Sequence, residues 1–125
     1  MARRLFTLDE ANALLPSLHS LLTEMVEARH RIVEAEPSLW PVLEKAIGNG
    51  GSKEAGAVLP HFETIQRNVQ MIQNLGIEIK DIGAGLVDFP SERDGRVIYL
   101  CWRLGEPSVT HWHELDAGFA GRQPL

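Results

Sequence analysis

The chain has one cysteine and one tyrosine among its 125 residues, and it has no long apolar run. A single cysteine cannot form a disulfide within the chain, so a reducing compartment is expected. No apolar stretch approaches the roughly 20 residues that a membrane-spanning helix needs, and the first residues lack the apolar core of a signal peptide. We therefore expect a cytoplasmic protein that does not enter a membrane.

Positive charge is also scarce. Lys and Arg number 12 against 17 Asp and Glu, which gives a formal net charge of −5 at pH 7, and the basic residues form no run. Nucleic acids and anionic membranes bind clustered Lys and Arg, so neither is an expected partner. A composition of 44% hydrophobic and 23% charged residues is typical of a soluble globular protein, and the length suits a single domain over residues 1–125.

The first half of the chain has the patterns of helices. Residues 7–10 (TLDE) form a capping box, and apolar residues then recur at steps of three and four over residues 11–32. A second stripe of this kind covers residues 59–75. These stripes predict a long antiparallel helical hairpin over residues 7–75, with a flexible, glycine-rich linker near residues 48–52. The first stripe is wider than one packing partner needs, which predicts a homodimer formed through the helices.

Two details of this half can be predicted as well. Residues 38–47 are expected to form a short helix with Ser38 as its N-cap. The second long helix is expected to open either at Ser52 or with Pro60 in its first turn.

The second half has the patterns of strands. Residues 77–80 alternate apolar and polar side chains, and residues 86–89 form a short strand that Pro90 is expected to end. Residues 96–103 have the strongest strand pattern, and we expect them to pair with residues 86–89 as a β-hairpin through a loop of several residues. The predicted fold class is therefore α+β: a helical hairpin followed by a small antiparallel sheet and an ordered C-terminal tail, the last two within residues 77–125.

A short segment near the C-terminus contains candidate metal ligands. In an extended conformation, His111 and His113 project to the same side, and Glu114 and Asp116 can add oxygen ligands. Such a set suits a divalent ion, namely Zn, Mn or Fe. In a helical conformation the histidines diverge, and both can instead bind backbone atoms around Trp112. No CxxC or HExxH motif is present, so no cofactor is assigned from the sequence.

Charged side chains in the same region form a second candidate site. The ligand-binding candidates are Arg103, Glu106, His113, Arg122 and Gln123. The two guanidinium groups among them can bind a small anionic ligand such as a carboxylate or a phosphate. The alternative is a set of ion pairs that connects the tail to the sheet.

Cys101 has two interpretations. A cysteine with a nearby histidine as base can act as a nucleophile. Cys101 stands in the middle of a predicted strand, between Leu100 and Trp102, and free cysteine is among the most buried residue types. Burial by packing is the prediction.

Three longer segments carry a resemblance to a known family. FTLDEANALLP, LGIEIKDIGAGLVDFPSERDGRVIYLCWRLGEP and WHELDAGFAGRQPL resemble a bacterial family catalogued as a domain of unknown function, number twenty-two-zero-three. The resemblance implies a small cytoplasmic protein and brings no activity, substrate or cofactor. The family pattern falls on Asp88, Phe89, Pro90, Tyr99, Trp102, Arg103, Gly105, Glu106, Trp112, His113, Gly118, Phe119, Gly121, Arg122 and Gln123. His111 lies outside that pattern, which favours His113 over His111 as a site residue.

Two functional hypotheses follow. The first is a non-catalytic binding or assembly module that homo-oligomerises through its helices and binds a small ligand or a partner at its tail. The alternative is a metal-dependent or acid–base enzyme with a site around His113. The sequence identifies no catalytic residue.

Overall fold

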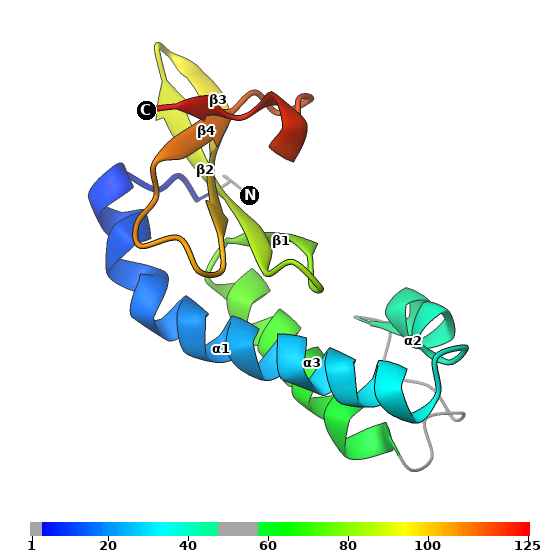
Figure 1. The fold of residues 1–125 in the computed structure, drawn as a ribbon. Coiled ribbons are helices and arrows are strands. Elements are labelled where there is room, and N and C mark those ends of the chain that lie inside the picture. The colour runs from blue at the N-terminus through cyan, green and yellow to red at the C-terminus, as the bar shows by residue number, and fades with distance from the viewer. Residues whose placement is uncertain (1–3, 48–57) are drawn as a thin grey trace.

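The structure, a computed structural model, describes residues 4–47 and 58–125 (Figure 1). Its elements in chain order are α1 (Leu8–Ala35), α2 (Trp40–Ala46), α3 (Leu59–Asn74), β1 (Glu78–Asp81), β2 (Leu86–Arg93), β3 (Arg96–Arg103), β4 (His111–His113), the 3-10 helix η2 (Phe119–Gly121) and β5 (Gln123–Pro124). The strands form one five-stranded antiparallel sheet in the order β1-β2-β3-β4-β5. The α+β fold class is confirmed. The linker near residues 48–52 and the helix start at Ser52 lie outside the described residues.

The capping box opens α1 as the sequence predicts. The Thr7 hydroxyl accepts a hydrogen bond from the Glu10 backbone N–H at 3.1 Å, and the Glu10 carboxylate accepts one from the Thr7 N–H at 2.8 Å. α1 then continues as one helix past Pro16 and packs along α3 (Figure 1). Leu22 of α1 and Ile65 of α3 are fully buried, so the helical hairpin is held together by its apolar stripes.

The extra width of the α1 stripe is used within the chain. Leu14, Leu21 and Val33 are partly buried, and they pack against the same hydrophobic core as the fully buried helix residues. This core also includes sheet residues such as Phe89 and Trp102. The homodimer stays a prediction, and the pattern from which it was inferred has an explanation inside one molecule.

The start of α2 differs from the prediction. Its N-cap is Leu39 rather than Ser38, because the Ser38 hydroxyl turns back and donates to the Glu36 carboxylate at 2.9 Å. Pro41 stands in the first turn of α2, where a missing N–H costs nothing. α3 likewise has Pro60 in its first turn, which is one of the two predicted starts.

The β2–β3 hairpin is longer and tighter than predicted. β2 runs through Pro90 to Arg93, and Arg93 pairs with Arg96 across the turn residues Asp94 and Gly95. Both turn residues have positive φ, 53° and 78°, as a tight hairpin turn requires. The predicted loop of several residues, and a strand ending at Pro90, are therefore wrong. Pro90 is tolerated because the pairing of β2 with β1 ends at Asp88, so the missing N–H leaves no ladder bond unmade.

Side chains alternate between the two faces of this sheet. The face that we call inner carries the apolar side chains of Val87, Phe89, Leu100, Trp102 and Trp112, which share one hydrophobic core with α1 and α3. The opposite face, here the outer face, carries Asp88, Pro90, Tyr99, Cys101, His111 and His113. Of the candidate residues, His111 and His113 lie on the outer face. None of the described helices is long and apolar enough to cross a membrane.

Candidate functional site

Three titratable side chains meet on the outer face of the sheet. Asp88 of β2 pairs directly with Cys101 of β3, and His113 of β4 stands one pair further along, opposite Tyr99. One ligand atom from each of Asp88, Cys101 and His113 lies within 4.8 Å of the other two. All three residues are at most 2% exposed. We call this group the Asp–Cys–His cluster.

Hydrogen bonds fix the orientation of the His113 ring. Its Nδ1 lies 2.7 Å from the backbone carbonyl oxygen of Glu114, and its Nε2 lies 3.0 Å from Oδ2 of Asp88. A carbonyl oxygen only accepts, so Nδ1 carries a proton and donates it. The contact between Nε2 and the Asp88 carboxylate therefore needs one further proton, held by either partner. Two lone pairs would otherwise face each other.

Tyr99 and its neighbours cover one side of the cluster. The Tyr99 ring packs on the His113 ring with centroids 5.4 Å apart, and the Tyr99 hydroxyl donates to the Glu78 carboxylate at 2.8 Å. The Lys80 ammonium lies 4.7 Å from the centroid of the Tyr99 ring and 2.9 Å from the same carboxylate group. This layer, formed by β1 and β3, shields the imidazole from solvent.

Burial disfavours the charged forms of the two acidic members. It is the main cause that raises the pKa of Asp88, against the opposing effects of His113 and Lys80. Burial, followed by the charge of Asp88, raises the pKa of the Cys101 thiol to about 12. Oδ1 of Asp88 has no conventional hydrogen-bond partner among the described residues, although the Cys101 thiol, a weak donor, interacts with the Asp88 carboxylate and lowers its pKa slightly. Cys101 is buried as predicted, and a thiol with so high a pKa is a poor nucleophile.

The cluster has the composition of a metal site. A thiolate, an imidazole and a carboxylate are all ligands of zinc and related ions, and these three side chains can hold one ion. The Glu114 carbonyl accepts from the His113 nitrogen that faces away from Asp88, as the outer partners of metal-bound histidines commonly do.

A second polar group adjoins the cluster and is centred on Arg122, just after η2. Its guanidinium pairs with the Glu106 carboxylate and lies 2.8 Å from Nδ1 of His111. Glu106 also accepts a hydrogen bond from the Arg103 backbone N–H at 2.7 Å. Burial tends to raise the pKa of Glu106, but the Arg122 guanidinium, the Arg103 N–H and the nearby positive charge together lower it. These contacts form an ion-pair network that joins the tail to the sheet.

The predicted ligand-binding residues thus separate into two groups. Glu106 and Arg122 bind each other, while His113 belongs to the Asp–Cys–His cluster. The Arg103 side chain is exposed, and Gln123 stands on β5 opposite Trp112, away from the cluster. A site for a small anionic ligand stays a prediction.

The predicted metal ligands also separate. His111 and His113 are in an extended strand and lie on the same face of the sheet, as that conformation requires. The Glu114 carboxylate instead forms an ion pair with Arg96 at 2.6 Å, and Asp116 is exposed.

Sequence reasoning missed Asp88 and Cys101 as companions of His113. The Asp94-Gly95 dipeptide marks a turn in the sequence and is typical of a two-residue hairpin, but ending the preceding strand at Pro90 left the register open. Pairing outward from that turn places Asp88 opposite Cys101.

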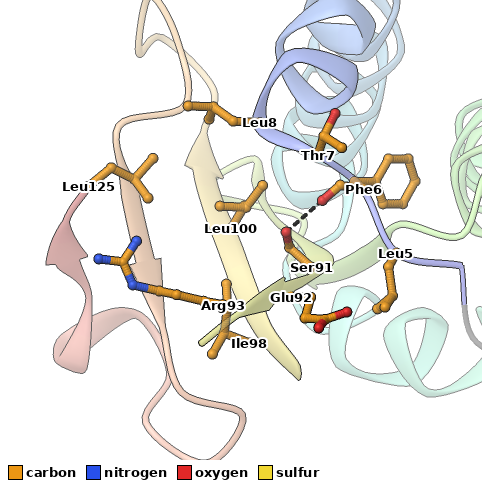
Figure 2. A pocket seen from close by; sticks show the side chains of 10 residues that line it. All are labelled: Leu5, Phe6, Thr7, Leu8, Ser91, Glu92, Arg93, Ile98, Leu100 and Leu125. Carbon is orange, nitrogen blue, oxygen red and sulfur yellow. Dashed lines mark hydrogen bonds between the residues drawn. The ribbon is translucent and has the colours of Figure 1, made fainter. Parts of the chain in front are cut away.

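The hollow drawn in Figure 2 is separate from these groups. It has a volume of about 490 Å³ and lies where the residues before α1 meet β2, β3 and the last residue of the chain. Apolar side chains such as Leu8, Leu100 and Leu125 line most of it, and Arg93 stands among them (Figure 2). No member of the Asp–Cys–His cluster lines this hollow.

Comparison with known proteins gives a family but no function. No curated protein and no solved structure matches the chain. The model of one family, described as an uncharacterized conserved protein (DUF2203), matches residues 4–125. That range includes both helices of the hairpin, the whole sheet and the Asp–Cys–His cluster. The chain therefore belongs to the DUF2203 family.

Proposed function

We propose that this protein binds a divalent transition-metal ion, zinc above all, through Asp88, Cys101 and His113. One observation carries the proposal: three ligand types converge within 4.8 Å at a buried place. Polar groups buried in a protein are normally satisfied, yet among the described residues Oδ1 of Asp88 has no hydrogen-bond partner stronger than the weakly donating Cys101 thiol. A metal ion would supply that partner.

The donor set distinguishes between the metals expected from the sequence. Thiolate and imidazole suit zinc, whereas manganese prefers oxygen ligands, of which the cluster offers one carboxylate. Iron shares several ligand preferences with zinc, so metal analysis has to separate these two. The ligand types favour zinc as the first candidate.

The charges of the cluster also suit a divalent ion. Bound to a metal, Asp88 and Cys101 would carry one negative charge each, which a doubly positive ion neutralises. Without a cation, burial favours the protonated forms of both, in line with the raised pKa of each group. A metal ion would replace the proton between Asp88 and His113 and the proton on the thiol, so binding should release protons.

Binding is supported better than catalysis. The three side chains are at most 2% exposed, so a substrate has no direct access to them in this arrangement. A buried metal site is consistent with a non-catalytic binding module, and no reaction is included in the proposal.

The test is metal analysis of untagged protein purified without chelators. We expect close to one zinc per chain and, after metal removal, uptake of one added Zn²⁺. Cys101→Ala and His113→Asn should each weaken Zn²⁺ binding by at least about tenfold, because each removes a ligand. His30→Asn is the matched control, since His30 is an exposed helix residue with 72% of its side chain accessible.

Circular dichroism on every variant separates lost binding from lost folding. The proposal is wrong if the folded, metal-free protein takes up no Zn²⁺, or if folded Cys101→Ala binds Zn²⁺ as tightly as His30→Asn does.

A further inference from the structure

His111 adjoins the Asp–Cys–His cluster without belonging to it, and its ring is engaged elsewhere. It pairs directly with Cys101 across β3 and β4 and shares the outer face with His113. Its Nδ1 lies 2.8 Å from the Arg122 guanidinium and 2.9 Å from the Thr110 hydroxyl. A guanidinium only donates, so Nδ1 accepts and the ring proton of the neutral imidazole is on Nε2. Neither ring nitrogen then has a lone pair to offer a metal ion.

Arg122 is the cation that already sits beside the cluster. Only 13% of its side chain is exposed, and it is held by the Glu106 carboxylate as well as by His111. Its positive charge also acts on the Cys101 thiol and lowers the pKa of that group, against the larger effect of burial. A metal ion bound to Cys101 would therefore lie close to the guanidinium, and two positive charges near each other in a buried place repel.

We propose that His111 is the fourth ligand of the metal site and that Arg122 keeps it from binding until a metal ion displaces the guanidinium. This inference rests on the proposed function. Once Arg122 has left, the Thr110 hydroxyl can accept from an Nδ1–H, which moves the ring proton to Nδ1 and frees the Nε2 lone pair. A hydroxyl can donate or accept, so Thr110 suits both states of the ring.

The fourth ligand decides the type of site. Three protein ligands leave a coordination position open for water or a substrate, whereas four close a tetrahedral site. With His111 included, the ion would bind β2, β3 and β4 together and exclude water. The displaced Arg122 belongs to the segment that contains η2 and β5, so metal binding would loosen this segment.

The experiment is a Co²⁺ titration of the metal-free full chain, followed by visible absorption. Tetrahedral cobalt absorbs more strongly in the visible range than five- or six-coordinate cobalt, so the spectrum reports the number of ligands. The variants are Arg122→Gln, His111→Asn and the double variant. Asparagine keeps an acceptor for Arg122 but is a poor ligand for these ions. Arg103→Gln is the control, since it removes an equal charge from an exposed side chain nearby.

We expect Arg122→Gln to bind Co²⁺ about tenfold more tightly than the unmodified protein, which corresponds to about 1.4 kcal/mol. His111→Asn should bind about tenfold more weakly and lose most of the visible absorption. In the His111→Asn background, Arg122→Gln should tighten binding clearly less than it does in the unmodified protein, because only the charge repulsion is relieved and the ligand that Arg122 restrains is gone. Arg103→Gln should resemble the unmodified protein in affinity and spectrum.

Two results would overturn the inference. If Arg122→Gln tightens binding equally with and without His111, Arg122 acts through its charge alone. If folded His111→Asn keeps the affinity and spectrum of the unmodified protein, His111 is not a ligand. Should Cys101→Ala weaken binding while His111→Asn changes neither the affinity nor the spectrum, the proposed function stands and only this inference fails. If no variant and no unmodified protein binds Co²⁺ or Zn²⁺, both fail.

Discussion

The two faces of the sheet are buried to a similar degree but for different physical reasons. On the inner face, Leu100 and Trp102 are 4% and 2% exposed and pack against apolar side chains. On the outer face, Asp88, Cys101 and His113 are at most 2% exposed, yet their partners are polar. Apolar packing tolerates many residue choices of similar volume, whereas buried polar atoms each need a matched partner. The outer face is therefore the more informative one about function.

The largest loss of stability is expected from a substitution in the apolar core of the inner face. Trp102 is the largest of the fully buried side chains, and its indole N–H donates to the Glu106 carbonyl at 3.0 Å. Trp102→Ala should lower the free energy of unfolding by about 4 kcal/mol, because it removes apolar contacts and leaves a cavity. Urea denaturation followed by circular dichroism measures the loss.

Met71→Ala serves as the control for a large-to-small change without burial. Met71 is 48% exposed on α3, so its truncation should change the free energy of unfolding by no more than about 0.5 kcal/mol. Equal losses in the two variants would show that Trp102 is not a core residue in solution.

On the outer face, the corresponding substitution removes a hydrogen-bond partner of a buried side chain rather than apolar packing volume. Asp88→Ala leaves His113 buried without its hydrogen bond and should cost about 3 kcal/mol in metal-free protein. Asp88→Asn should cost markedly less, because its amide N–H can donate to the Nε2 lone pair of a neutral His113. The same denaturation series measures both.

The losses of unfolding free energy caused by Asp88→Ala and Asp88→Asn, compared with each other, test whether the outer face needs a hydrogen bond or a charge. If Asp88→Asn proves as damaging as Asp88→Ala, a hydrogen bond from the amide does not replace the carboxylate, and the stability of the outer face depends on the negative charge of Asp88. For the apolar side chains of the inner face no such difference is expected, because near-isosteric apolar substitutions there should all cost little.

The inner face could be predicted from the sequence better than the outer one. Alternation in residues 96–103 placed Ile98, Leu100 and Trp102 on one side, and the spacing in residues 11–32 predicted the helix that shares their core. Periodic burial is repeated along the chain, so it is visible in a single sequence.

The outer cluster depends on the exact register of three strands, and one misjudged strand end was enough to hide it. Ending a strand at Pro90 removed residues 91–93 from β2, and the predicted long loop left the pairing of Asp88 undefined. The sequence offered ion pairs between the tail and the sheet as an alternative, but it did not identify Glu106 and His111 as the partners of Arg122. Glu106 follows a turn and Arg122 follows a 3-10 helix, and neither segment has a periodic pattern. Contacts between irregular segments leave little trace in local spacing.

A smaller loss of stability is expected when a polar residue of the inner face is substituted. Ser91 is 6% exposed and donates from its hydroxyl to the Phe6 carbonyl, which fixes the segment before α1 against β2 (Figure 2). Ser91→Ala should cost about 1 kcal/mol of unfolding free energy, because the carbonyl loses a donor at a buried place. Ser20→Ala is the matched control: Ser20 is exposed in a helix, where alanine is favoured, so no loss is expected. A loss in Ser20→Ala as large as that in Ser91→Ala would contradict this account.

The smallest loss of stability is expected in the ion-pair network around Arg122, beside the Asp–Cys–His cluster, and it should depend on pH. The pKa of Glu106 in the folded protein is below its ordinary value of 4.5, so its ion pair with Arg122 stabilises the fold above that pH. As pH falls below 4.5 through the lowered pKa, the carboxylate takes up a proton and the stabilisation is lost.

Glu106→Gln should therefore be less stable than the unmodified protein at pH 7 by at most about 1 kcal/mol, since the pair is partly exposed. The difference should shrink toward zero once the pH is below the lowered pKa. Trp102→Ala is the internal reference, because its deficit involves no titrating side chain and should change little over the same range. A Glu106→Gln deficit that stays constant with pH would mean that the side chain matters for its shape and not for its charge, which would make this part of the outer face resemble the inner one.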